Sequence, residues 1–172
     1  YGTSGGTEKK TISSISGAQI NLTGALAYDH PSPARVSNLT RNVVIKGADS
    51  TYTAYILNLN QTAPANFSLH SAQISYMGKN SANKWGVTFL SARGTIDFSS
   101  IHEGYYGLYL QDSSSNSFTN NLVYGHSGRG IYSNISFSNT FAANQSYASG
   151  PGIWLDSSDN NTLASNEIYS GG

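Results

Sequence analysis

The chain contains no cysteine in its 172 residues, so it can form neither a disulfide nor a thiolate zinc site. Charged residues make up only 10% of the sequence, and nine basic and nine acidic side chains leave a net charge of zero. The basic residues do not gather in a cluster, which argues against binding to nucleic acid or to an anionic membrane surface. No apolar run approaches the roughly 20 residues of a bilayer span.

What the sequence does contain is an internal repeat headed by glycine. Gly107, Gly130 and Gly152 begin units that are spaced by 23 and 22 positions. Each unit carries an Asn nine positions after its glycine, a second Asn five positions later and a Tyr three beyond that: Asn116, Asn121 and Tyr124, then Asn139, Asn144 and Tyr147, then Asn161, Asn166 and Tyr169. A fixed period near 22 without helical spacing is typical of a solenoid. We therefore predict an all-β fold, a right-handed parallel β-helix with about 22 residues per coil.

Two regions are expected. Residues 1–33 are predicted to form an N-terminal antiparallel β cap and a linking loop, because Thr11–Ile15 and Gln19–Leu22 flank a Ser-Gly-Ala turn and prolines follow at positions 31 and 33. Residues 34–172 are predicted to form the β-helix repeats. Since the chain starts without Met and stops as a strand group ends, we expect a processed product or a segment of something longer.

The repeat also predicts which side chains face inward. Alternate residues of a strand point to opposite sides, so two columns are expected in the core: Val87, Leu108, Ile131 and Ile153, and Phe89, Leu110, Ser133 and Leu155. The column between them is expected to form an exposed ladder: Thr88, Tyr109, Tyr132 and Trp154. Aromatic rings stack on sugars and are also enriched at subunit interfaces. The candidate carbohydrate or subunit contacts are Tyr105, Tyr106, Tyr109, Tyr132 and Trp154.

Asparagine has two predicted uses. The column of Asn121, Asn144 and Asn166 is expected to be structural, with stacked amides that bond to each other and to the backbone. Seven Asn-x-Ser/Thr sequons are present, and six are candidates for glycosylation: Asn21, Asn38, Asn60, Asn66, Asn134 and Asn160. The sequon at Asn144 is expected to stay bare, because it lies in the ladder.

The sequence gives little support for catalysis or metal binding. The four histidines form no pair at ligand spacing, and His102 shares the column of Tyr124, Tyr147 and Tyr169, which predicts a stack of outward rings. No metal site and no cofactor are predicted. Asp97 and Glu103, with Asp112, are the only reasonable carboxylate cluster, which makes Asp97 and Glu103 weak catalytic candidates. Asp112 and Asp156 lie near turns, where Asp is common, which favours a structural interpretation.

Several phrases of the chain resemble the cell-surface hyaluronidase family and its fibrocystin-like relatives. They are Ala27-Tyr28-Asp29-His30, the run Leu39-Thr40-Arg41-Asn42-Val43-Val44-Ile45, and Ser75-Tyr76-Met77-Gly78. The resemblance covers roughly residues 11–133 and implies the β-helix that follows an eight-glycine domain. Thr88, Leu90, Gln111 and Arg129 occupy positions where that family has histidines. The resemblance therefore implies a chain that has the fold of an enzyme family but lacks its histidines.

The sequence favours a non-catalytic extracellular or cell-surface glycoprotein with a structural or adhesive role, able to assemble into fibres. The alternative is a carbohydrate-binding module or a hyaluronidase-like, polysaccharide-degrading enzyme, so the question of catalysis stays open. Expected partners are glycans, covalent or bound, and further copies of the chain or the rest of a longer chain. Nucleic acid is not expected as a partner.

Overall fold

A computed structural model describes residues 10–17, 19–27, 43–51, 53–60, 62–63, 67–147 and 150–169. The chain divides into two compact units, Tyr1–Asn38 and Leu39–Gly172, which are considered separately. In the first unit, β1 (Ile12–Ser16) and β2 (Gln19–Leu22) pair as an antiparallel hairpin. Gly17 lies in its turn with φ of 57°, a left-handed conformation that glycine adopts without strain. This hairpin confirms the short antiparallel element predicted near the N-terminus.

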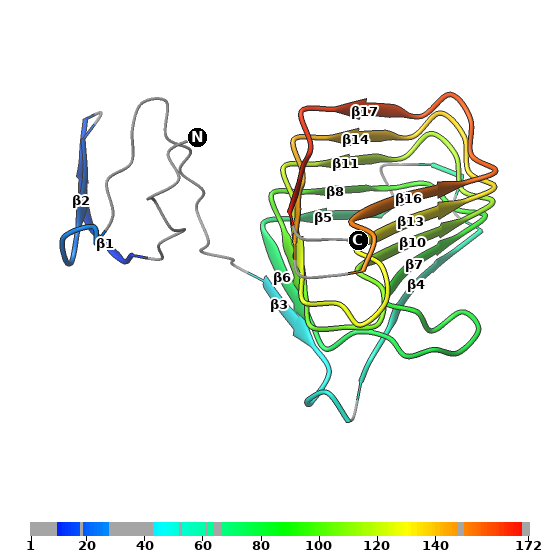
Figure 1. Ribbon diagram of the computed structural model, residues 1–172, viewed down its shortest axis with the longest axis horizontal. Helices are drawn as coiled ribbons and strands as arrows, with labels where there is room; N and C mark the ends of the chain where they lie inside the picture. The colour runs from blue at the N-terminus through cyan, green and yellow to red at the C-terminus, as the bar shows by residue number, and fades with distance from the viewer. Residues whose placement is uncertain are drawn as a thin grey trace. The chain divides into compact units, whose positions relative to one another are not determined.

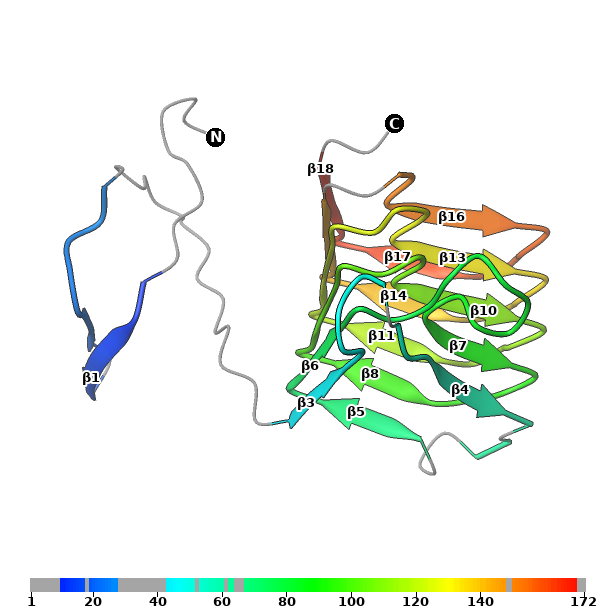
Figure 2. The same ribbon diagram turned by 90° about the horizontal axis from the view of Figure 1, so that it is seen from below.

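The second unit is a parallel β-helix made of three sheets (Figures 1 and 2). Sheet I contains β4 (Ile56–Leu59), β7 (Val87–Leu90), β10 (Leu108–Gln111), β13 (Ile131–Asn134) and β16 (Ile153–Asp156). Sheet II contains β5 (Ser68–His70), β8 (Thr95–Asp97), β11 (Ser117–Thr119), β14 (Thr140–Ala142) and β17 (Thr162–Ala164). Sheet III contains β3 (Val43–Lys46), β6 (Ala72–Ser75), β9 (Ser100–His102), β12 (Leu122–Tyr124), β15 (Gln145–Tyr147) and β18 (Glu167–Tyr169). The predicted solenoid is confirmed.

The turns of the solenoid differ in length. In the regular turns Leu108 pairs with Ile131, 23 positions on, and Ile131 pairs with Ile153, 22 positions on. The first turn is longer, because Ile56 pairs with Val87, 31 positions on. Extra residues lie in the connection between β6 and β7, which spans positions 76–86, whereas the connection from β9 to β10 spans only 103–107. This longer connection, the β6–β7 loop, shapes the surface beside sheet I.

The predicted inward columns form the core. Val87, Leu108 and Ile131 are 0–2% exposed, and Phe89 and Leu110 are fully buried. Sheet II contributes further rings, which are likewise fully buried: Phe118 and Phe141 stack with centroids 5.5 Å apart. The same columns become exposed at the last described turn, where Leu155, Leu163 and Ile168 are 37–50% exposed. The core is therefore a continuous stack along the solenoid.

Polar ladders hold the corners between the sheets. Asn121 accepts a hydrogen bond from the Ser99 N–H at 3.0 Å through Oδ1, and its Nδ2 donates to the Ile96 carbonyl at 2.8 Å and to Asn144 Oδ1 at 3.1 Å. Asn144 bonds in the same way to Asn166 and to the Phe118 carbonyl. Each amide therefore ties two successive turns together, as predicted for a structural ladder.

A serine ladder at another corner was missed by the sequence analysis. Ser113 Oγ accepts the Ala92 N–H, Ser136 Oγ the Ser113 N–H, and Ser158 Oγ the Ser136 N–H, at 2.9–3.0 Å. Each of these serines follows a residue with positive φ: Asp112, Ile135 and Ser157. The sequence signal was present, because the three serines all stand six positions after a repeat glycine.

Candidate ligand-binding surface

The outward column of sheet I is covered at one end and open at the other. Thr88 is 0% exposed, Tyr109 is 5% exposed, Tyr132 is half-buried and Trp154 is 42% exposed. The prediction of an exposed ladder was therefore wrong for Thr88 and Tyr109, and the candidate contact Tyr106 is also buried, at 9% exposure. It holds for Trp154 and in part for Tyr132.

The cover over Tyr109 comes from the residues that precede the repeat glycines. Trp85, at the end of the β6–β7 loop, packs on Tyr109 with ring centroids 4.4 Å apart. Tyr106 lies 5.9 Å from Tyr109 on another side, and Tyr105 lies 4.5 Å from Tyr106. Sequence periodicity identifies which side of a strand faces outward, but it does not show which loop folds over that side.

Arg129 completes this aromatic cluster, which we define as Trp85, Tyr105, Tyr106, Tyr109, Arg129, Tyr132 and Trp154. The Arg129 guanidinium carbon lies 4.4 Å from the Tyr132 ring centroid and 4.8 Å from that of Trp154. Its Nη1 donates to the Tyr106 hydroxyl at 3.0 Å. Cation–π contacts of this kind contribute about 0.5–2 kcal/mol each and fix the rings in place. The sequence analysis treated Arg129 only as a lost histidine, although it stands directly before Gly130, as Tyr106 stands before Gly107.

A polar column runs beside the rings, two residues further along each strand. Gln111, Asn134 and Asp156 are in register on β10, β13 and β16. The Tyr109 hydroxyl donates to Gln111 Oε1 at 2.7 Å, and the Tyr132 hydroxyl donates to Asp156 Oδ2 at 3.1 Å. Asn134 Nδ2 donates to the same Gln111 oxygen at 2.6 Å. The surface thus offers ring faces next to amide and carboxylate groups.

The phenols of Tyr109 and Tyr132 stay neutral. Burial raises the pKa of the Tyr109 hydroxyl. Burial, followed by the hydrogen bond to Asp156, raises the pKa of the Tyr132 hydroxyl. Both groups therefore act as hydrogen-bond donors over the whole neutral range.

The described histidines of the β-helix, His70, His102 and His126, lie away from this surface or have other contacts. The His102 ring stacks on Tyr124 with centroids 4.8 Å apart, and Tyr124 stacks on Tyr147 at 5.1 Å, which confirms the predicted ring column on sheet III. His102 Nδ1 lies 3.3 Å from Glu103 Oε2, and burial lowers the pKa of the imidazole.

His126 is buried, with Nδ1 accepting the Gly104 N–H at 3.2 Å and Nε2 lying 3.1 Å from the Ile101 carbonyl oxygen. Burial lowers the pKa of His126 to about 4. Its two ring nitrogens are thus both taken up by backbone groups.

The weak catalytic candidates do not come together. Asp97 ends a strand of sheet II, and its Oδ2 lies 3.0 Å from His70 Nδ1. Glu103 follows a strand of sheet III, and Asp112 follows a strand of sheet I. The three carboxylates thus lie on three different sides of the solenoid. Among the residues that the structure describes, no group of three or more His, Asp or Glu side chains could hold a metal ion.

The candidate glycosylation sites have different surroundings. Asn60 and Asn160 are exposed, whereas the amides of Asn21 and Asn134 are bonded to Ser14 and Gln111, respectively. Asn144 is 1% exposed, in agreement with the expectation that it stays bare. The sequons at positions 38 and 66 lie outside the described residues.

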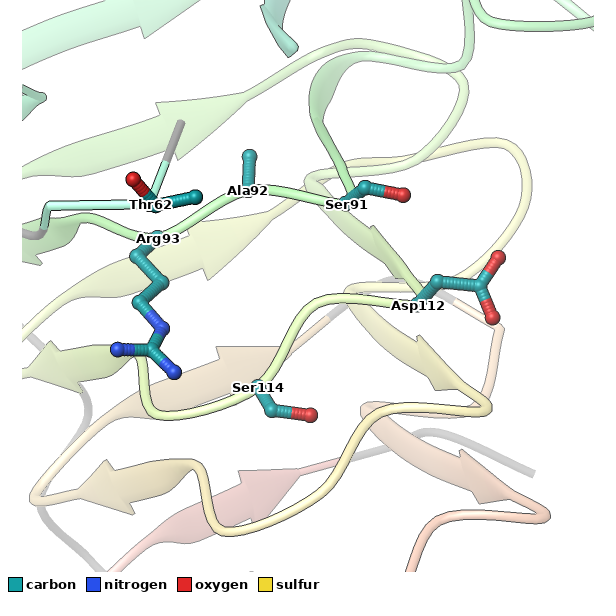
Figure 3. Close-up of a pocket in the computed structure, with 6 residues that line it drawn as sticks. All are labelled: Thr62, Ser91, Ala92, Arg93, Asp112 and Ser114. Atoms are coloured by element: carbon teal, nitrogen blue, oxygen red, sulfur yellow. The ribbon is translucent and has the colours of Figure 1, made fainter. Parts of the chain in front are cut away.

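Two hollows lie at the corners of sheet I. One, of about 290 Å³, is lined by Thr62, Ser91, Ala92, Arg93, Asp112 and Ser114, with Arg93 and Asp112 at its opposite ends (Figure 3). Asp112 already accepts a hydrogen bond from Gln111 Nε2 at 2.9 Å. The other, of about 350 Å³, is lined by Thr51, Thr53, Ala54, Tyr55, Lys79 and Lys84. The second hollow borders the β6–β7 loop that carries Trp85.

These features define a parallel β-helix protein with an aromatic surface along one sheet. The chain belongs to the family described as periplasmic copper-binding protein (NosD), whose model matches residues 7–172. No curated protein and no solved structure matches the chain. The comparisons do not confirm the resemblance to cell-surface hyaluronidases. The family is described as periplasmic, and no helix among the described residues is long and apolar enough to cross a membrane.

Proposed function

We propose that the chain is a non-catalytic β-helix, acting in the periplasm or at the cell surface, that binds an extended glycan along sheet I in an adhesive role. The observation that carries the proposal is the register of two columns on one sheet: the rings of Tyr132 and Trp154, and the polar groups of Asn134 and Asp156 beside them. Ring faces provide apolar contact with sugars, and neighbouring amides and carboxylates accept or donate hydrogen bonds to sugar hydroxyls.

The surface is preorganised for such a ligand. Arg129 contacts the Tyr132 and Trp154 rings, and Asp156 holds the Tyr132 hydroxyl. Because these side chains are fixed before binding, little conformational entropy is lost when a sugar chain docks. Trp154, at 42% exposure, offers the largest open ring area of the column.

The absence of catalysis is supported by the positions of the acids. Hydrolysis of a glycosidic bond uses two carboxyl groups about 5–9.5 Å apart. Asp97 instead ends a strand of sheet II and Glu103 follows a strand of sheet III, and each lies beside a histidine: His70 and His102. Ion pairs of this kind are common on protein surfaces, and the pairing by itself indicates no catalytic role.

Copper binding, the property in the family's description, finds no support from the described residues. Copper favours thiolate, thioether and imidazole ligands. The sequence has no cysteine, its one Met, Met77, is 1% exposed within the core, and the described histidines, His70, His102 and His126, belong to no group of three or more potential ligand side chains. These residues do not fit a copper centre, and we assign no copper-dependent step to them.

Calorimetric titration with a panel of soluble oligosaccharides tests the proposal. Trp154→Ala should weaken binding by at least about tenfold, as expected for a central aromatic contact. Phe137→Ala is the matched control, because Phe137 is 37% exposed but lies outside the columns of sheet I. If no oligosaccharide binds, or if both variants bind like the wild type, the proposed surface is wrong. Turnover that is lost in Asp97→Asn or Glu103→Gln would overturn the non-catalytic assignment.

A second candidate function is axial association between copies of the chain. It is favoured by the exposed core positions of the last described turn, Leu155, Leu163 and Ile168, and by β16 and β17, which are the outermost described strands of sheets I and II. Unpaired strand edges are templates for pairing with another chain. Light scattering over a wide concentration range tests this idea, and a strictly monomeric particle at the highest concentration would exclude it.

A further inference from the structure

The hollow at the Lys79 end of sheet I has a composition unlike the rest of the surface. Its volume is about 350 Å³, and its walls come from the β3–β4 connection (Thr51, Thr53, Ala54 and Tyr55) and from the β6–β7 loop (Lys79 and Lys84). Two lysines thus share one small space in a chain that has only nine basic residues. None of the described residues that line the hollow is acidic.

The positive charge of this hollow is not neutralised from within. Within the described parts of the chain, neither lysine takes part in an ion pair, and the Lys84 ammonium lies 5.6 Å from the centroid of the Tyr55 ring. The Lys79 N–H donates to the Lys84 carbonyl at 2.7 Å, so the two residues are held together across a tight turn. The turn therefore keeps the two residues at one place, beside an open ring and two threonine hydroxyls.

The hollow is also joined to the aromatic cluster. Trp85 follows Lys84 directly and packs on Tyr109, whose strand carries the column that continues to Tyr132 and Trp154. A chain lying along sheet I would reach the two lysines at the end where the β6–β7 loop covers the sheet. The positive charge of the two lysines is therefore expected to influence which ligand binds along sheet I.

We propose that this hollow binds the carboxylate of a uronic acid unit, and that the glycan bound along sheet I is an acidic polysaccharide. This inference rests on the proposed function and specifies its ligand. The ammonium groups of Lys79 and Lys84 bind the carboxylate, the hydroxyls of Thr51 and Thr53 bond to sugar hydroxyls, and Tyr55, 47% exposed, contacts the sugar ring. Net charge of zero and a local pair of lysines suit a chain with spaced negative charges rather than a polyphosphate.

Calorimetric titration with two matched probes tests the inference: a galacturonic acid oligomer and its uncharged methyl ester. The variant Lys79→Gln/Lys84→Gln should bind the acid about 5–30-fold more weakly than the wild type, because each partly exposed contact between opposite charges contributes a factor of a few. Binding of the ester should be unchanged. Raising the salt concentration should weaken binding of the acid more than that of the ester. Lys46→Gln is the control, because Lys46 is exposed on β3 and does not line the hollow.

The outcomes separate this inference from the proposed function. If the double variant binds the acid like the wild type, or if the wild type does not prefer the acid to the ester, the lysine hollow is not the carboxylate site. In that case the glycan surface still stands, provided that Trp154→Ala weakens both probes. If the wild type binds neither probe nor any neutral oligosaccharide, both proposals are wrong. Circular dichroism of each variant checks that the β-helix has formed.

Discussion

Asn121 gives the sharpest test of how the solenoid is held together. Its side chain is 3% exposed and satisfies two backbone groups of the preceding turn, the Ser99 N–H and the Ile96 carbonyl. Asn121→Ala removes both partners and leaves these groups buried without water. Each buried group left unsatisfied costs about 1–3 kcal/mol, so the variant should lose about 2–6 kcal/mol of stability. That loss is a large fraction of the ~5–15 kcal/mol that stabilises a typical domain.

Urea denaturation followed by circular dichroism measures this loss. For a slope of about 2 kcal/mol per M, the midpoint should fall by roughly 1–3 M urea. Ser117→Ala is the control from the same turn, because the Ser117 side chain is on the outward side of sheet II and should change the midpoint little. A loss below about 0.5 kcal/mol for Asn121→Ala would refute the reasoning, since it would mean that water or a local shift replaces both hydrogen bonds.

A second variant separates the two roles of the amide. In Asn121→Asp, the carboxylate can still accept the Ser99 N–H, but it cannot donate to the Ile96 carbonyl or to Asn144 Oδ1. It also places a charge in a buried position, which is costly. We expect this variant to be as unstable as Asn121→Ala at pH 7 and to recover stability on acidification, when the protonated carboxyl regains a donor. A flat pH profile would contradict the assigned donor role.

Two further predictions concern the corner around His126. Burial lowers the folded-state pKa of His126 to about 4, below the unfolded value of about 6.5. The contribution of His126 to the free energy of unfolding is therefore complete above pH 6.5 and is lost as the pH falls toward 4. Urea denaturation at several pH values should show this loss as about 3 kcal/mol of unfolding free energy. His126→Asn should make the unfolding free energy less dependent on pH. If the pH dependence is the same in the variant as in the wild type, other groups cause it. Gly107→Ala should cost about 3 kcal/mol or more in the same assay, because the added Cβ would lie 2.5 Å from the Gly130 carbonyl oxygen and 2.6 Å from Val123 Cγ1. Gly125→Ala, where the nearest atom is 3.6 Å away and φ is 68°, should cost only about 1 kcal/mol; equal losses would show that the close approach at Gly107 is unimportant.

Much of the fold followed from the spacing of a few residue types. The repeat glycines, the paired asparagines and the tyrosine column predicted the parallel solenoid and its core columns. The stack of His102 on Tyr124 followed in the same way, because like positions in successive turns lie directly above one another. The serine ladder was equally visible in the sequence but was not recognised, since serine is common in turns of every kind.

The candidate surface could be predicted only in part. The alternation within strands correctly indicated that Tyr109, Tyr132 and Trp154 leave the core on the same side of sheet I. Burial of Tyr109 depends on Trp85, which comes from a connection that breaks the repeat. The lysine hollow depends on the same connection and on the one between β3 and β4. The repeat does not predict the positions of residues that lie outside it, because they have no equivalents in neighbouring turns.

The sequence by itself determined the all-β solenoid, the period of its regular turns and the inward side of each strand. These features repeat, so every turn imposes the same steric and hydrogen-bonding requirement on the next. That requirement can be recognised from the spacing of residues in the sequence. Only the tertiary structure decided which outward rings are covered, where Arg129 packs among them and which lysines line one hollow. Those contacts join segments of unequal length, and their distances depend on how each irregular loop folds back on the sheet.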